Sequence, residues 1–266
     1  EPEARRTRDA ISTAIGAVQL PDLLLQADAD INFSEALLGR KATSVDELIA
    51  LYGGLIAHGT ENDAKGVAAM IPQLQPSQVT AAMRTLEGHG RLRRANDRVV
   101  EFQRKIPIAE LWGRGDKASA DMMALDASRH LYNARVDPRR RTFAAGIYTH
   151  VLDRYGVIYD QPIVLNERQS GAAVEGVERH NHSGEDRVRL SLLAVDTHGY
   201  TNATMSIAKL LGFDLCPQLR NLVERKLHLP RGIQIPDGVE QVTVLGVSLN
   251  AISKNWDEIL RLIASI

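Results

Sequence analysis

The sequence has a single cysteine, no long apolar run and few aromatic residues. Cys216 is the one cysteine among 266 residues, so no disulfide can form within the chain. No run approaches the about 18 apolar residues that a membrane-spanning helix needs. Aromatic residues make up 5% of the chain, which argues against a base-stacking platform for single-stranded nucleic acid. These absences favour a reducing compartment, and we expect a cytoplasmic protein that does not span a membrane.

The chain also has little net charge. It contains 32 lysines and arginines against 33 aspartates and glutamates, for a formal net charge of -1. A role with nucleic acid would therefore depend on local basic patches. Two such clusters are present, at 91–105 and 129–141. Clusters of this kind are usually solvated surfaces, although arginine is also the residue type that contacts phosphate.

The composition is that of a folded protein, with 44% hydrophobic and 24% charged residues. The length suits one large domain or two ordinary ones. We expect a helical domain or linker over 1–110 and a second domain over 111–266. The helical pattern continues to the last residue, so we also expect the chain to be an internal segment of a longer protein.

Apolar residues in the first part recur at helical spacing, as in Val45, Leu48, Ile49 and Tyr52. Ser44 stands where a capping box would begin the helix, and Pro76 is placed to start a later one. This region contains no metal-binding or nucleophile pattern. A packed helical bundle without chemistry of its own is the plainer interpretation.

From about residue 119 the apolar spacing changes to the two-residue period of strands. Two strands, over 141–152 and 157–165, are joined by the short segment 153–156 and predict a hairpin. Pro162 lacks an N–H donor, so its strand is expected at a sheet edge.

Further strands and helices alternate toward the end of the chain. Residues 190–195 are nearly all apolar, which predicts a central, parallel strand covered on both faces. Helices are expected over 170–178, after Thr201 and from Trp256, with a short strand over 213–216. This order predicts an α/β fold built on a mixed sheet with flanking helices.

Two aspartates are candidate metal ligands. Asp196 directly follows the apolar strand, at the carboxyl end where open α/β sheets bind ligands. Asp121 lies inside the apolar strand 119–126, where burying a carboxylate is costly unless it is paired or binds a cation. Side-chain alternation places Asp126 on the opposite face. If Asp121 and Asp196 converge, they could hold divalent cations for phosphoryl transfer; otherwise Asp196 is an ordinary turn residue.

Two other patterns carry little chemistry. The histidines at 130, 150, 180, 182 and 198 form no helical ligand pair, and a single cysteine argues against a zinc site. Gly113 and Gly115 lack the preceding strand and following helix of a nucleotide-binding loop, so we interpret them as a turn.

Several motifs occur together in an order that resembles the transposases of the Tn3 family, chiefly over 112–266. Weaker similarity extends upstream, around 22–33. The motifs that carry the resemblance are Trp112-Gly113-x-Gly115, Ser119-Ala120-Asp121, Ile147-Tyr148-Thr149-His150, Asp196-Thr197-His198-Gly199-Tyr200-Thr201, Leu210-Leu211-Gly212-Phe213, Pro217-x-x-Arg220 and Asn255-Trp256-Asp257-Glu258-Ile259-Leu260-Arg261.

The resemblance implies an RNase H-like catalytic domain with an Asp-Asp-Glu metal triad, preceded by helical domains that bind DNA. On the matching positions, Asp121 is the first carboxylate and Asp196 the second. The family often has Ser-Ser-Asp-Gly at the first position, which makes Asp126 the alternative, but its opposite face favours Asp121. The third carboxylate, a Glu in an Asn-Lys-Gly-Glu motif, has no match here. The glutamates considered and rejected for that role are Glu224, Glu240 and Glu258.

We therefore expect a fragment of a DNA transposase, with Mg²⁺ or Mn²⁺ as cofactor. The reaction implied is phosphodiester cleavage at transposon ends followed by strand transfer to target DNA, and the fragment alone is expected to be inactive. Expected partners are double-stranded DNA and further copies of the chain. The residues expected near DNA phosphates are Arg139, Arg140, Arg141, His198, Arg220, Arg225 and Lys226. The alternatives are an inactive DNA-binding or assembly module, and a metal-dependent nuclease on the same fold.

Overall fold

The computed structural model describes residues 2–88, 90–184, 187–221, 224–235, 237–238 and 242–266. Contacts within the chain divide it into a helical unit, 1–106, and an α/β unit, 107–266. In the described residues no single helix is long and apolar enough to cross a membrane. The first two helices satisfy the same length and composition criteria only as a pair, and they are bent by 73° from one another.

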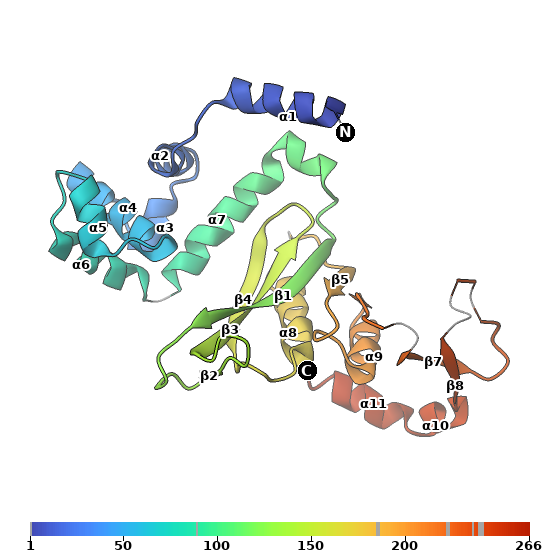
Figure 1. The fold of residues 1–266 in the computed structure, drawn as a ribbon. Helices are drawn as coiled ribbons and strands as arrows, with labels where there is room; N and C mark the ends of the chain where they lie inside the picture. The colour runs from blue at the N-terminus through green and yellow to red at the C-terminus, as the bar shows by residue number, and fades with distance from the viewer. Residues whose placement is uncertain (1, 89, 185–186, 222–223, 236, 239–241) are drawn as a thin grey trace. The chain divides into compact units, whose positions relative to one another are not determined.

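The helical unit contains the helices expected from the apolar spacing. They are α1 Pro2–Ile15, α2 Leu20–Ile31, α3 Phe33–Leu38, α4 Val45–Gly59, α5 Ala64–Met70, α6 Pro76–Leu86 and α7 Arg91–Lys105 (Figure 1). Ser44 caps α4 by accepting a hydrogen bond from the Glu47 N–H at 3.2 Å. The Glu47 carboxylate turns instead to Arg40 and to the Thr43 N–H, so only half of the expected capping box forms.

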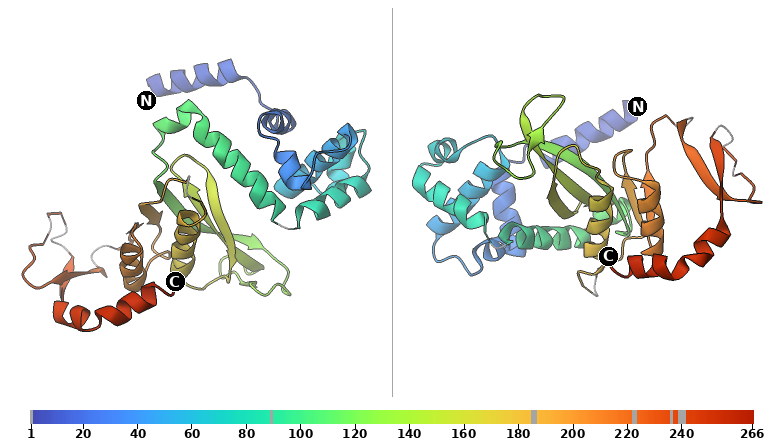
Figure 2. Two further views of the ribbon diagram at one scale, coloured as in Figure 1. Left: turned by 180° about the vertical axis from the view of Figure 1, so that it is seen from behind. Right: turned by 90° about the horizontal axis from the view of Figure 1, so that it is seen from below.

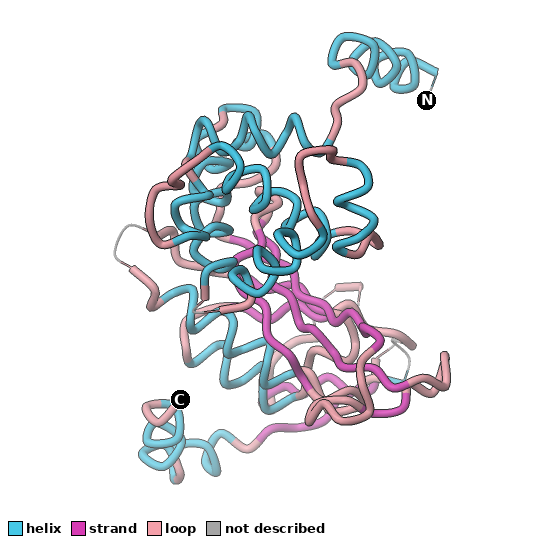
Figure 3. Tube along the Cα trace, turned by 90° about the vertical axis from the view of Figure 1, so that its left-hand side faces the viewer, coloured by secondary structure: helices cyan, strands magenta, loops and turns pink. Residues whose placement is uncertain are grey.

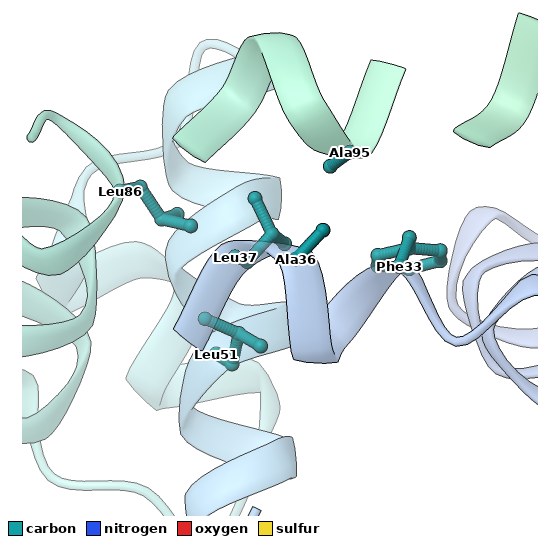
Figure 4. Packing of buried hydrophobic residues seen from close by; sticks show 6 residues of the cluster. All are labelled: Phe33, Ala36, Leu37, Leu51, Leu86 and Ala95. Carbon is teal, nitrogen blue, oxygen red and sulfur yellow. The ribbon is translucent and has the colours of Figure 1, made fainter. Parts of the chain in front are cut away.

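Two clusters of buried apolar side chains hold the helical unit together. The first joins α3, α4, α6 and α7 (Figure 4) and consists of Phe33, Ala36, Leu37, Leu51, Leu86 and Ala95. The second consists of Ala57, Val67, Leu74 and Val79. Full burial of each large aliphatic side chain contributes roughly 1.5–3 kcal/mol, so these clusters are the main source of the unit's stability.

The α/β unit is built on a mixed sheet, whose strands are magenta in Figure 3. After a 3₁₀ turn at Pro107–Leu111 its strands are β1 Lys117–Asp126, β2 Arg135–Val136, β3 Phe143–Leu152, β4 Val157–Ile163, β5 Leu192–Val195 and β6 Asp214–Pro217. The strand order is β2-β3-β1-β5-β6, with β4 also paired to β3. β1 is antiparallel to β3 and parallel to β5, and β6 is parallel to β5. This is the RNase H-like mixed sheet that the resemblance implied.

Most of the predicted elements of this sheet are confirmed. β3 and β4 form the hairpin, and the Pro162 strand pairs only with β3 among the described residues. β5 is central and parallel, between β1 and β6. Helix α8, Ser170–Asn181, precedes β5, and α9, Asn202–Leu210, follows it with Thr201 as its N-cap. The two helices contact each other (Figure 2).

The two faces of the sheet differ in cover. α8 packs against β3, β4 and β5, and α9 packs against β6, so Tyr148, His150 and Leu193 are fully buried on the covered face. The other face is open: Met123 is 60% exposed, and Asp121 on the same side of β1 is also exposed. Two expectations were therefore wrong. β5 is covered on one face only, and Asp121 is not a buried carboxylate, because odd-numbered positions of β1 point to the open side.

The Gly113 and Gly115 segment is a turn, as expected. The Gly115 N–H donates to the Asp153 carboxylate at 3.0 Å, and the Arg154 side chain donates to the Gly113 carbonyl at 2.9 Å. A Cβ on Gly113 would lie 2.1 Å from the Asp153 carboxylate. The glycine therefore allows this turn to close against the end of the hairpin.

The last part of the chain forms a small parallel sheet and two helices. These elements are β7 Lys226–Pro230, β8 Thr243–Val247, α10 Leu249–Lys254 and α11 Trp256–Ile263. The predicted amphipathic helix from Trp256 is confirmed as α11. Its N-cap is Asn255. Ser253, three residues before Trp256, lies in the preceding helix α10. The sheet β7-β8 was not predicted.

Candidate active site

Asp121 and Asp196 open into the same cavity. The last paired residues of β1 and β5 are Ala120 and Val195, so the two aspartates take the next position on neighbouring parallel strands. Both line a cavity of about 810 Å³ at the carboxyl ends of β5 and β6, and both also line a second one of about 440 Å³ on the open face of the sheet. The structure thus brings together the two carboxylates named from the sequence.

Backbone donors orient both carboxylates. Oδ1 of Asp196 accepts hydrogen bonds from the N–H groups of His198, at 2.9 Å, and Gly199, at 3.0 Å. A Cβ on Gly199 would lie 2.7 Å from the Val195 side chain, so glycine lets this turn fold tightly under the carboxylate. Oδ1 of Asp121 accepts from the Met122 N–H at 2.7 Å. Within the described part of the chain, the hydrogen bonds to these carboxylates all go to Oδ1, which leaves Oδ2 of each for a ligand.

Asp126 has a different environment. Its carboxylate accepts from the Thr142 hydroxyl at 3.1 Å and pairs with Arg140 at 3.1 Å, and it lines neither cavity. The Asp126 side chain is therefore held by Thr142 and Arg140, away from the cavities that Asp121 lines.

The three consecutive arginines at 139–141 have distinct surroundings. Arg139 lines the larger cavity. The Arg140 guanidinium donates to the Asp137 carboxylate and to the Ala124 carbonyl, both at 2.9 Å. This hydrogen bond from Arg140 is the largest cause that lowers the pKa of Asp137, and the Arg139 N–H adds to it. Arg141 is exposed and adopts a left-handed backbone conformation, with φ of 58°. Arg140 therefore ties the loop after β2 to β1.

Of the other residues expected near DNA phosphates, some line the larger cavity and some do not. His198 and Arg220 line the larger cavity, whereas Lys226 lies in β7 and lines neither cavity. Arg225 donates to the Arg220 carbonyl at 3.2 Å and to the Tyr200 hydroxyl at 3.2 Å. Arg225 therefore supports the backbone behind Arg220.

The first basic cluster, in α7, makes contacts inside the helical unit. Arg91 donates to the carbonyls of Leu37 and Leu38 at the end of α3, and Arg98 donates to the carbonyls of Ile31 and Asn32 at the end of α2. Arg104 and Lys105 pair with Glu101. Most side chains of this cluster donate hydrogen bonds to carbonyls at helix ends or form ion pairs within the helical unit. This agrees with the interpretation of the cluster as part of the unit's surface structure.

Tyr148 lies beneath the carboxylates on the covered face. It is fully buried, and its hydroxyl is 3.0 Å from where a Cβ on Gly199 would stand. Burial raises the pKa of the Tyr148 phenol, and the negative charges of Asp196 and Asp121 raise it further. A neutral phenol therefore lies on the covered face of the sheet, behind the two carboxylates.

Sequence reasoning missed two residues that shape this site. Thr197 and Gln218 both line the larger cavity, and Gln218 also lines the smaller one. A signal was available, since Gln218 comes two residues after the predicted strand 213–216, close to the way Asp196 directly follows 190–195. The register between those two strands cannot be read from the sequence, so the equivalence of Gln218 and Asp196 was not apparent.

The residues present fit a hard divalent cation. Their donors are carboxylate oxygens, the ligand type that Mg²⁺ and Mn²⁺ prefer. Across the residues that the structure describes, no group of three His, Cys, Asp or Glu side chains is placed to hold a metal, so the set here is a carboxylate pair. Glu224 and Glu258 line neither cavity, and Glu240 lies outside the described residues.

Comparison with known proteins identifies the family. A family model described as the Tn3 transposase DDE domain matches residues 22–266. The chain belongs to the Tn3 transposase DDE family. It is 46% identical, over all of its 266 residues, to the transposase for insertion sequence element IS1071 in transposon Tn5271 of Comamonas testosteroni. It covers 27% of that relative, so the chain spans about a quarter of the relative's length.

More distant proteins are also described as transposases. The transposase for transposon Tn1546 of Enterococcus faecium is 23% identical over 99% of this Tn3-family chain and 27% of the relative. Among solved structures, the piggyBac transposase synaptic complex with hairpin DNA has a TM-score of 0.36 and 12% identity, over 66% of this chain and 42% of that one. The family assignment rests on the sequence matches.

Proposed function

We propose that this chain carries the first two metal-binding carboxylates of a DNA transposase, Asp121 and Asp196. The observation that supports this most directly is their shared cavity, which both line from neighbouring positions of the parallel strands β1 and β5. In the longer protein, the reaction would be cleavage of a phosphodiester at the transposon end and transfer of the freed 3′ hydroxyl to target DNA.

Different residues of this chain would bind the cation and the DNA. Asp121 and Asp196 would hold Mg²⁺ or Mn²⁺, with Oδ1 fixed by backbone donors and Oδ2 directed to the cation. When bound, the cation would stabilise negative charge on the attacking and leaving oxygens. Arg139, His198 and Arg220 line the same cavity and would contact the phosphates on either side of the scissile bond.

Double-stranded DNA is the proposed partner, together with other copies of the chain. The basic side chains around the cavity are arginines, which suit phosphate contacts, and binding should weaken steeply as salt rises. A cytoplasmic location remains a prediction from the composition.

Cation binding tests the proposal on the chain as it stands. Isothermal titration calorimetry with Mn²⁺ should show binding that is lost in Asp121→Asn and in Asp196→Asn. Asp126→Asn is the matched control, since this aspartate lies in the same strand but pairs with Arg140. Equal Mn²⁺ affinity in all four proteins would refute the assignment of the carboxylate pair.

Catalysis needs a longer chain, because the family uses three carboxylates where this segment supplies two. Cleavage of transposon-end DNA should occur with a chain extended through the Asn-Lys-Gly-Glu segment and not with residues 1–266 alone. Asp121→Ala or Asp196→Ala in the extended chain should abolish it. Robust cleavage by the short chain would show that other residues are catalytic.

A further inference from the structure

Three side chains form one row across three parallel strands, inside β1 and just past the ends of β5 and β6. Ala120, Val195 and Pro217 stand side by side in β1, β5 and β6. The next residues along these strands are Asp121, Asp196 and Gln218.

The parallel ladder continues to the end of this row. The Gln218 N–H donates to the Val195 carbonyl at 2.8 Å. Residues in register on parallel strands point to the same face, so Gln218 extends the row of the two carboxylates. Asp121, Asp196 and Gln218 are also the three residues that the two cavities described above share.

The Thr197 hydroxyl ties together the loops that carry Asp196 and Gln218. It donates to the Gln218 carbonyl at 2.9 Å and accepts from the Arg220 N–H at 3.1 Å. Arg225 adds a hydrogen bond to the Arg220 carbonyl from the other side. The backbone of Gln218 is thus fixed beside Asp196 by hydrogen bonds on both of its peptide groups.

The chemistry of the Gln218 side chain suits a phosphate oxygen. Its amide is exposed and, within the ranges that the structure describes, makes no hydrogen bond to the protein. A glutamine amide offers two N–H donors without a charge, so it can hold a phosphate oxygen next to the carboxylates without competing with their cation. Glutamine is among the side chains that contact phosphates in protein–DNA complexes.

We propose that Gln218 binds the DNA strand at this site, donating an amide N–H to a phosphate oxygen beside the carboxylate pair, and that Thr197 is the positioning residue that holds it there. This inference rests on the proposed function, because the phosphate is that of the DNA substrate.

Binding of DNA and of cation can be measured separately on the 266-residue chain. Fluorescence anisotropy of a short fluorescein-labelled DNA duplex, with Ca²⁺ present, reports DNA affinity, and calorimetry with Mn²⁺ reports cation affinity. Gln218→Ala should weaken duplex binding about tenfold, the effect of losing one hydrogen bond to a charged group, and leave Mn²⁺ affinity unchanged. Gln218→Glu should weaken duplex binding further, because it adds a negative charge facing the phosphate. The matched control is Gln26→Ala, an exposed glutamine of α2, which should match the wild type.

The positioning role of Thr197 has its own signature. Thr197→Val should weaken duplex binding at least as much as Gln218→Ala does, because the hydroxyl also holds the Arg220 N–H, and Thr197→Ser should restore it. The double variant Thr197→Val/Gln218→Ala should bind no more weakly than Thr197→Val alone, because the Gln218 contact is already lost there. Additive losses, or a Thr197→Ser variant as weak as Thr197→Val, would overturn this role.

The remaining outcomes distinguish this inference from the proposed function. Wild-type duplex affinity in Gln218→Ala, or a loss of Mn²⁺ affinity in its place, would overturn the phosphate contact while leaving the carboxylate pair intact. If Asp121→Asn and Asp196→Asn bind Mn²⁺ like the wild type, the proposed function fails and this inference fails with it.

Discussion

Gly176 of α8 lies directly against the ring of the buried His150. A Cβ at this position would stand 2.2 Å from the nearest ring atom, so helix α8 can approach β3 only because residue 176 has no side chain. The His150 Nε2–H donates to the Ala173 carbonyl of α8, 3.0 Å away. This contact sets the distance between the helix and the covered face of the sheet.

Gly176→Ala should therefore destabilise the α/β unit by about 1–3 kcal/mol, the usual cost of overpacking a core. Gly171→Ala, in the same helix with nothing within 4 Å of the added Cβ, should be neutral or stabilising by up to about 1 kcal/mol. Urea unfolding followed by tryptophan fluorescence measures both, since Trp112 and Trp256 both lie in this unit. Equal stability of the two variants would contradict the close approach.

His150 also predicts a dependence of stability on pH. Burial is the main cause that lowers the pKa of its imidazole below the ordinary 6.5. As pH falls below about 6.5, the unfolded chain takes up a proton that the folded chain resists, so the free energy of unfolding decreases down to the folded pKa. The urea midpoint should fall between about pH 7.5 and about pH 5.5, and this fall should be smaller in His150→Gln. His182→Gln, at the exposed C-cap of α8, is the control substitution, and a wild-type slope in His150→Gln would refute this prediction.

At the scale of single residues, the sequence predicted the carboxylates and missed their neighbours. Asp196 was recognisable because an apolar strand ends directly before it. Glutamine is not a residue type that marks a site by itself. The place of Gln218 depends on the register between β5 and β6. That register is set by contacts between segments distant along the chain, which a local pattern does not contain.

Among the elements, the hairpin β3-β4, the central strand β5 and helices α8, α9 and α11 follow from local periodicity and caps. The cover of the sheet does not. A nearly continuous apolar run such as 190–195 indicates burial on both faces, yet Ala194 is exposed because α8 and α9 both pack on the other side. Small side chains, here alanine, are compatible with either environment. The sheet β7-β8 was also not predicted.

The loop between β2 and β3 contains a structural arginine, Arg140, and one that we propose contacts DNA, Arg139. Arg140→Ala should lower the urea midpoint, because Arg140 joins Asp137, Asp126 and the Ala124 carbonyl. Arg139→Ala should leave that midpoint unchanged but weaken duplex DNA binding and reduce its salt slope by about one, the loss of one phosphate contact. The salt slope of duplex DNA binding is measured in Arg141→Ala as well. An unchanged salt slope in both Arg139→Ala and Arg141→Ala would return this cluster to a solvated surface.

For the whole molecule, the sequence indicated a helical region followed by an α/β one, and the structure divides the chain into two such units. Composition could not reveal how much apolar surface each unit leaves exposed. In the last helix, α11, Trp256 is 41% exposed and Leu260 is 43% exposed on one apolar face. An exposed face of this kind is characteristic of an interaction surface.

We expect residues 1–266 to self-associate through this face of α11. Sedimentation velocity should show a mass that rises with concentration in the wild type and remains that of a monomer in Leu260→Lys. Asp257→Lys places the same residue on the polar face of the helix and should behave like the wild type. Association that persists in Leu260→Lys would assign it to another surface.

The open face of the sheet makes the lone cysteine a natural spectroscopic handle. Cys216 is exposed and stands in the row Ser119–Ala194–Cys216, two residues before the row of Asp121, Asp196 and Gln218 and on the same face. Two residues of strand are about 7 Å, so a nitroxide attached to this thiol would sit next to the carboxylate pair. Added Mn²⁺ should broaden the nitroxide spectrum of the wild-type chain and leave that of Asp196→Asn unchanged. No broadening at saturating Mn²⁺ would mean that the cation binds elsewhere.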